Sequence, residues 1–131
     1  MKNAENASHL PAYLGINVLH TSNGEACVEL AIEQCHLAPN GYLHAGTVIT
    51  LADSAAGFGC IASLPEGASN FTTIEIKSNH LSTAREGTLD CRAKAVHVGR
   101  TTQVWDATVT HRESGKTLAL FRCTQMILYP K

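Results

Sequence analysis

The sequence predicts an α+β domain in which an antiparallel sheet curls around one long, buried helix. Three observations support this. Two strand patterns come first, a single apolar stretch with helical periodicity follows, and four alternating segments separated by short turns fill the second half. With 131 residues, of which 44% are hydrophobic, the chain is long enough for one domain with its own core and short for two.

The first predicted elements are two strands joined by a tight turn. Residues 1–7 are polar and expected to be frayed, so we expect residues 8–131 to form the single domain. Residues 16–20 and 25–33 have strand patterns. The Asn-Gly pair between them is a strong hairpin signal, because both residues tolerate positive φ.

Residues 45–60 predict the central helix. At about 100° per residue their apolar side chains fill one broad arc, which would bury most of the helix circumference. We expect the helix to start near His44 and to end between residues 57 and 63. Its polar residues fall opposite the arc, namely Thr47, Thr50 and Ser54.

The second half predicts four more strands, at residues 72–81, 88–98, 102–111 and 117–128. Short turns between successive strands imply an antiparallel meander. Six strands and one helix leave one sheet face or edge to cover, which favours an oligomer.

Charge is distributed unevenly along the chain. Residues 1–66 carry one Lys or Arg against six Asp or Glu, and residues 67–131 carry nine against five. Between residues 34 and 65 the single formal charge is Asp53. Aspartate is unfavourable inside a helix because it competes with the backbone for hydrogen bonds, so Asp53 needs another reason to be there.

The overall composition argues against several classes of protein. A net charge of −1 is unlike that of nucleic-acid-coating or membrane-steered proteins. Uninterrupted apolar runs are far shorter than the about 20 residues that span a bilayer, so no membrane partner is expected. The start of the chain shows no apolar segment of a secretory signal, and the five cysteines are widely spaced without a C-x-x-C pair. We therefore expect small buried thiols in a cytoplasmic protein. A metal site is not expected, because Cys35-His36 and His44 match no common ligand spacing.

The start of the predicted helix could bind an anion or a developing oxyanion. A turn of small residues leaves the first amide groups of a helix unpaired and pointing outward. Ala45 and Gly46 would allow a carbonyl to approach these amides closely. Asp53 lies two turns along, about 12 Å away by helical rise. It could act on the same carbonyl if a second subunit supplied the amides across a two-fold axis.

Each of these residues also has a structural interpretation. His44 could cap the helix, and Asp53 could pair with a basic residue of the second half. Gly46 and Asn40 could be ordinary turn residues.

A resemblance to a known family rests on the segment Asn40-Gly41-Tyr42-Leu43-His44-Ala45-Gly46-Thr47, followed by Leu51-Ala52-Asp53. This segment resembles the His-Gly-Gly motif and central helix of hotdog-fold thioesterases of the phenylacetic acid degradation (PaaI) type. Similar stretches occur at residues 13–16, 72–87, 98–100 and 115–116. The resemblance implies hydrolysis of acyl-CoA thioesters by a homodimer with its active site at the subunit interface, assembled as a homotetramer. It implies no metal and no bound cofactor, coenzyme A being part of the substrate.

Residue roles carried over from this family centre on Asp53, which resembles the nucleophile or general base. The N–H of Ala45, and that of Gly46, would donate to the thioester carbonyl. His44 would orient the loop, and Thr73 would lie near the attacking water. Asp53 and Thr73 would face Asn40, His44 and Ala45 of the partner subunit.

Two departures from the family pattern stand out. Ala45 replaces the usual second glycine and keeps its amide, and Ala38 occupies the position of a side-chain amide. Asn40 would replace that amide, or the role is vacant.

The predicted substrate contacts fall into two groups. Candidates to line the acyl pocket are Tyr42, Ile49, Leu51 and Phe58, and candidates to bind the phosphates of coenzyme A are Lys77, Arg85 and Arg100. Aryl and alkyl acyl groups are not distinguished.

Two alternative functions share this fold. One is a non-catalytic acyl-CoA-binding protein, which Ala38 leaves open. The other is an acyl-thioester hydratase or dehydratase, against which the nine-residue spacing from His44 to Asp53 argues.

Overall fold

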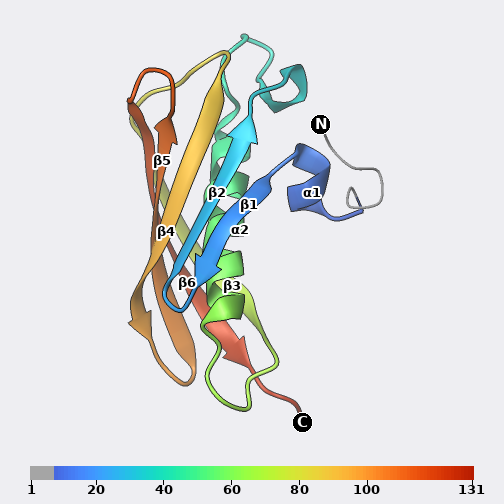
Figure 1. Ribbon diagram of the computed structural model, residues 1–131, viewed down its shortest axis with the longest axis vertical. Helices are drawn as coiled ribbons and strands as arrows, with labels where there is room; N and C mark the ends of the chain where they lie inside the picture. The colour runs from blue at the N-terminus through green and yellow to red at the C-terminus, as the bar shows by residue number, and fades with distance from the viewer. Residues whose placement is uncertain (1–7) are drawn as a thin grey trace.

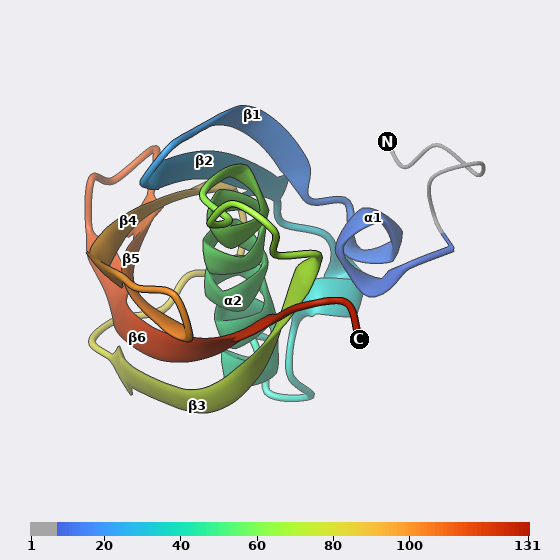
Figure 2. The ribbon, with the colours of Figure 1, turned by 90° about the horizontal axis from the view of Figure 1, so that it is seen from below.

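The computed structural model describes residues 8–131, and the predicted frayed segment at residues 1–7 lies outside the described residues. One six-stranded antiparallel sheet curls around a single long helix (Figures 1 and 2). This confirms the predicted α+β class and matches the hotdog arrangement that the resemblance implies. The elements in chain order are α1 (Leu10–Leu14), β1 (Asn17–Ser22), β2 (Glu25–Ala31), the 3-10 helix η2 (Gln34–His36), α2 (Ala45–Ala62), β3 (Asn70–His80), β4 (Thr88–Val98), β5 (Thr102–His111) and β6 (Thr117–Leu128).

The predicted hairpin between β1 and β2 is confirmed. Gly24 has φ of +87°, the left-handed conformation that a tight turn between paired strands needs. Along β2, Ala26, Val28 and Leu30 are buried and alternate with half-buried residues. Strand β2 therefore presents one apolar face to α2, whereas the residues of β1 are exposed.

The predicted central helix is also confirmed, with His44 as its N-cap and Ser63 as its C-cap. Its core-facing side contains many small residues, which let the sheet approach closely. At Gly59 a Cβ atom would lie 2.5 Å from the ring of the fully buried Trp105. The expectation for Thr47 was wrong, because this residue is buried and its hydroxyl donates to the His36 carbonyl at 2.9 Å. The η2 segment covers this first turn, which a helical wheel cannot show.

Judged by length and composition alone, α2 is apolar enough to cross a membrane. The short uninterrupted apolar runs of the sequence predicted no such helix. Thr and Gly residues interrupt these runs, but the helix as a whole remains apolar. In this fold the apolar side of α2 contacts β2, β4 and β5 (Figure 2).

The strand order β1-β2-β4-β5-β6-β3 corrects the predicted four-strand meander. Strands β4, β5 and β6 do form a meander, but β3 pairs with β6 and lies at the far edge of the sheet. Residues 81–87 are therefore a crossing connection and not a hairpin turn. Local alternation predicts strands but does not show which strands become neighbours.

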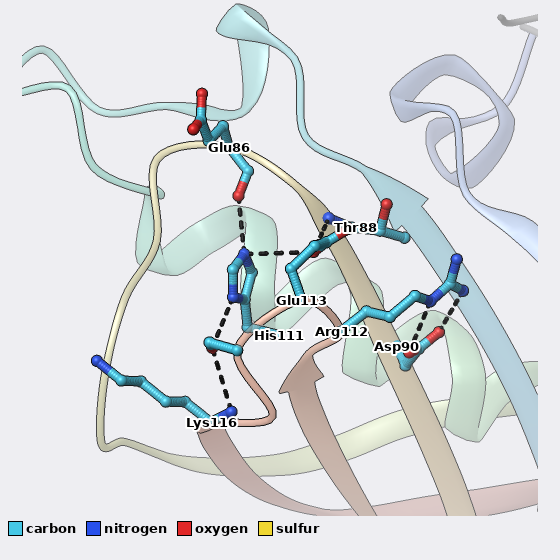
Figure 3. Close-up of polar contacts among 8 residues, drawn as sticks. Glu86, Thr88, Asp90, His111, Arg112, Glu113 and Lys116 are labelled. Carbon is cyan, nitrogen blue, oxygen red and sulfur yellow. Dashed lines mark hydrogen bonds and ion pairs between the residues drawn. The ribbon is translucent and has the colours of Figure 1, made fainter.

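Polar contacts hold this crossing connection against the β5–β6 turn (Figure 3). The ring of His111 donates through Nε2 to the Glu86 carbonyl at 2.8 Å, and its Nδ1 lies 2.7 Å from the Ser114 hydroxyl. Glu113 accepts from the Thr88 N–H at 2.9 Å. The end of the connection is thereby fixed where β4 begins.

Two short elements, α1 and η2, were not predicted from the sequence. The signals for α1 were Pro11 in its first turn and Gly15 at its end, which has φ of +88°. The cysteine prediction is confirmed for Cys60, Cys91 and Cys123, which are buried, and wrong for Cys35, which is exposed on η2. Cys27 is half-buried, and all five thiols are free.

Candidate active site

The start of α2 is capped by a histidine. The Nδ1 atom of His44 accepts a hydrogen bond from the Gly46 N–H at 2.8 Å. This contact needs the glycine, because a Cβ at position 46 would lie 2.9 Å from the same Nδ1. The Gly46 amide is therefore engaged. Ala45 is exposed, and among the described residues its N–H is paired with no acceptor, so this amide is the one available to a substrate carbonyl.

A second histidine, buried beneath the first, holds the cap in place. The His36 carbonyl accepts from the His44 N–H at 3.1 Å as well as from Thr47. The His36 ring accepts from the Glu33 N–H at 2.8 Å and donates to the Leu14 carbonyl at 2.7 Å. The role of His36 was not predicted, because it depends on segments that meet only in the fold.

The same contacts leave no ring nitrogen of His36 for a metal. Within residues 8–131 no three His, Cys, Asp or Glu side chains gather as ligands.

The loop before the helix is closed by its own hydrogen bonds. The Asn40 side chain accepts from the Tyr42 N–H at 3.0 Å, which gives Asn40 the role of a turn residue. Gly41 has φ of +89°, and its carbonyl accepts from Arg85 at 3.4 Å. The Arg85 guanidinium lies over the Tyr42 ring, 4.8 Å from its centroid. Tyr42 and Arg85 therefore lie together beside the helix start.

Asp53 lies in the middle of α2 in a half-buried position. Burial raises the pKa of its carboxyl, and a hydrogen bond from Thr73 opposes this shift. The Thr73 hydroxyl lies 3.4 Å from Asp53 Oδ1. No Lys or Arg within residues 8–131 forms an ion pair with Asp53, so the predicted alternative of a basic partner is wrong.

Thr73 reaches this position from the edge strand β3. A bulge at Ile74 shifts the register, so that Thr73 pairs with Gln125 of β6 and Glu75 pairs with the next residue back. The Thr73 hydroxyl donates to Gln125 Oε1 at 2.6 Å. Gln125 is fully buried and was not among the predicted site residues. Its signal was a lone amide at an inward position of an otherwise apolar alternation.

The other predicted binding residues are spread over the chain. Lys77 is exposed and lies opposite Arg122 in the β3–β6 strand register, on the sheet face turned away from α2. Arg100 lies at the β4–β5 turn beside Tyr129, 5.8 Å from its ring centroid. Of the three predicted cations, Arg85 alone lies beside the helix start.

The residues predicted to line the acyl pocket also lie in different environments. Ile49 and Phe58 are half-buried, whereas Leu51 is fully buried in the core of its own chain and does not line a pocket.

One stripe of α2 is only partly covered by its own sheet, through Thr73 and Phe71 of β3. It contains the half-buried Ile49, Asp53 and Gly57 and the exposed Ile61, each four residues from the next. On the neighbouring edge strand β3, Ile74 is 52% exposed. Asp53 thus lies at the centre of an apolar surface left open by the single chain, two helical turns from Ala45.

The family model of the thioesterase superfamily matches residues 40–118, from the loop before α2 into β6. The chain belongs to the thioesterase superfamily. This thioesterase is 36% identical over 111 residues to the 1,4-dihydroxy-2-naphthoyl-CoA hydrolase of Listeria monocytogenes, covering 85% of this chain and 89% of the relative. It is 30% identical over 129 residues to the protein of the same name from Escherichia coli, covering 96% and 91%.

The solved structures agree with this assignment. A mutant thioesterase from Pseudomonas aeruginosa superposes with a TM-score of 0.88 at 26% identity, covering 97% of this chain and 91% of that one. The protein is a hotdog-fold enzyme that hydrolyses thioesters.

Proposed function

We propose that this thioesterase hydrolyses aromatic acyl-CoA thioesters, with Asp53 as the general base or nucleophile. The observation that carries the proposal is the environment of Asp53. It is a half-buried carboxyl with a raised pKa and a hydroxyl neighbour, and within residues 8–131 no cation neutralises it. A carboxylate without a cationic partner remains basic enough to take a proton from water or to attack a carbonyl.

The second part of the proposed site is the N-terminus of α2 in a partner subunit. The free Ala45 N–H would donate to the thioester oxygen as negative charge develops on it. His44 would keep this amide in place by capping the helix through Gly46. Because Ala45 and Asp53 of one chain are separated by about 12 Å, the thioester carbonyl would lie between two chains.

A homodimer fits the uncovered apolar surface. The open stripe of α2 and the exposed Ile74 and Ile76 of β3 would be buried by a second copy. The homotetramer implied by the resemblance remains a prediction.

The acyl group is proposed from the relatives and from the residues beside the helix start. Both relatives at 30% identity or more described above are named for a bicyclic aromatic acyl-CoA. Tyr42, Ile49 and Phe58 supply apolar and aromatic surface, and Arg85 supplies a cation for a phosphate of coenzyme A. The preference therefore extends beyond the phenylacetyl group of the PaaI type.

A panel of acyl-CoA substrates tests this proposal. Free thiol would be measured with 1,4-dihydroxy-2-naphthoyl-CoA, phenylacetyl-CoA, octanoyl-CoA and crotonyl-CoA. We expect the bicyclic aromatic substrate to give the highest kcat/KM. A higher value for octanoyl-CoA would contradict the aromatic assignment, and hydration of crotonyl-CoA without thiol release would indicate a hydratase.

Substitution of Asp53 tests the catalytic role. Asp53→Asn is expected to lower kcat at least about 10²-fold with little change in KM, because the base acts mainly in the transition state. Ser54→Ala, at the next half-buried position of the same helix, is the matched control and should keep its turnover. Unchanged turnover in Asp53→Asn would remove Asp53 from the mechanism.

A further inference from the structure

A row of polar side chains crosses three neighbouring strands beneath α2. In the strand register, Gln103 of β5 pairs with Gln125 of β6, and Gln125 pairs with Thr73 of β3. Both glutamines are fully buried. A buried amide group without a partner costs about 1–3 kcal/mol, so two adjacent glutamines in a core call for an explanation.

Gln103 has a structural explanation. Its Nε2 donates to the Ser63 carbonyl at 2.9 Å, and its Oε1 accepts from the Trp105 indole N–H at 2.7 Å. Both ends of the amide are therefore satisfied. This residue fixes the C-cap of α2 and the largest aromatic side chain of the core.

Gln125 is only half explained. Its Oε1 accepts from the Thr73 hydroxyl, while its Nε2 is buried and has no hydrogen-bond partner among the described residues. The Thr73 hydroxyl has a single proton and lies near two acceptors, Gln125 Oε1 at 2.6 Å and Asp53 Oδ1 at 3.4 Å. It cannot donate to both at once.

We propose that Gln125 is a positioning residue, which acts through Thr73 and whose amide turns over to match the protonation state of Asp53. This inference rests on the proposed function, in which Asp53 is the general base. With Oε1 towards Thr73, the hydroxyl donates to Gln125, and its oxygen accepts a hydrogen bond from the neutral carboxyl of Asp53. After a 180° turn, Nε2 donates to Thr73, and the hydroxyl donates to ionised Asp53.

The unpartnered Nε2 is the donor that this second arrangement uses. In the reaction the proton passes from the attacking water to Asp53 as the water oxygen bonds to the thioester carbon. The C–S bond then breaks, and Asp53 returns the proton to the leaving sulfur of coenzyme A. Gln125 gains and loses no proton, and only the directions of two hydrogen bonds reverse. A glutamine suits this position because it carries a donor and an acceptor at interchangeable sites.

The other titratable group facing Asp53 from β6 is the Cys123 thiol. Burial is the larger cause and the charge of Asp53 the next, and together they raise the pKa of this thiol to about 12. The thiol is therefore neutral at physiological pH. Cys60, on α2 itself, has a pKa raised by burial to about 11. Neither thiol supplies the charge that Thr73 and Gln125 respond to.

A double-mutant cycle with Thr73 tests the proposal. Gln125→Met keeps the side-chain length and removes both polar atoms. We expect it to lower kcat about tenfold in the wild-type background, with KM changed less than about twofold, and to lower kcat less than about twofold in a Thr73→Val background. Equal losses in both backgrounds, or an unchanged kcat, would overturn it.

Thermal stability separates positioning from a structural role. Met in place of a partly satisfied buried amide is expected to leave Tm unchanged or raised, while kcat falls. Gln103→Met, in the same buried row without a contact to Thr73, is the matched control, and its Tm should fall while kcat is retained. A Tm loss in Gln125→Met that accompanies its whole kcat loss would contradict the proposal.

Two further outcomes keep the test decisive. If Gln125→Met does not fold, Gln125→Glu preserves the shape, and its kcat is expected to fall as the introduced carboxyl ionises and loses its only donor. A pH profile parallel to the wild type would count against the inference. Full activity of Asp53→Asn would remove the proposed function itself, whereas a fully active Gln125→Met beside an inactive Asp53→Asn would remove this inference alone.

Discussion

At the scale of single residues, Asp53 differs in its surroundings from the acids on the outer surface of the sheet. Glu25, Asp90 and Asp106 each form an ion pair with an arginine at 2.7 Å or less. The arginine beside Asp106 lowers the pKa of that carboxyl, whereas burial raises the pKa of Asp53. Relative to the protonated form, the ionised form of Asp53 is therefore less stable than the ionised form of Asp106.

This raised pKa predicts a stability effect with a definite sign. Protonated Asp53 favours the folded state relative to the unfolded one, so that contribution is lost as pH rises through the raised pKa. Asp53→Asn should therefore increase the free energy of unfolding at pH 7, and the gain should shrink below the unfolded pKa of 3.8. Urea unfolding at pH 7 and pH 3.5 measures it. A destabilised variant at pH 7 would mean that the carboxylate is well solvated or paired.

Part of the site could be predicted residue by residue. Asp53 was visible as a lone charge, and His44 as a polar residue before a helix of small residues. Gln125 was not predicted, although an amide interrupts the apolar face of its strand. The role of His36 was not readable, since its ring bonds to backbone atoms of Leu14 and Glu33 that only the folded chain brings together.

At the scale of elements, periodicity predicted α2 and the bounds of β4, β5 and β6. It did not predict the position of β3, because strand pairing is decided by contacts distant in sequence. This pairing decides where Thr73 of the candidate site lies. Pairing with β6 places Thr73 between Gln125 and Asp53, whereas the predicted meander would have placed β3 beside β4.

The packing of α2 against β5 gives a prediction for a glycine. Gly→Ala inside a helix usually stabilises by up to about 1 kcal/mol. At Gly59 the new Cβ would lie 2.5 Å from the buried Trp105 ring, so we expect Gly59→Ala to destabilise by about 1–2 kcal/mol net. Gly57→Ala is the control, because its neighbour Phe71 is half-buried and able to move. Thermal melts compare the two, and a stabilised Gly59→Ala would contradict this helix–sheet contact.

At the scale of the whole molecule, two ion pairs on the sheet join the basic half of the sequence to the acidic half, Arg92 with Glu25 and Arg112 with Glu29. Arg92, Arg112 and Arg122 of the basic half form ion pairs with acids on the outer face, so they are not free cations for a ligand. The nearly uncharged stretch becomes η2, the capping loop and α2. Its single charge, Asp53, lies on the stripe of α2 that the sheet covers only in part.

The central claim is that each active site combines Asp53 of one subunit with the α2 N-terminus of another. Asp53→Asn and His44→Ala chains carrying different tags would be coexpressed, and the mixed dimer purified through both tags. One of its two sites then has both wild-type residues, so we predict about half the wild-type kcat per dimer, although each variant homodimer is nearly inactive. A mixed dimer no more active than the variant homodimers, or failure to isolate any mixed dimer, would contradict the claim.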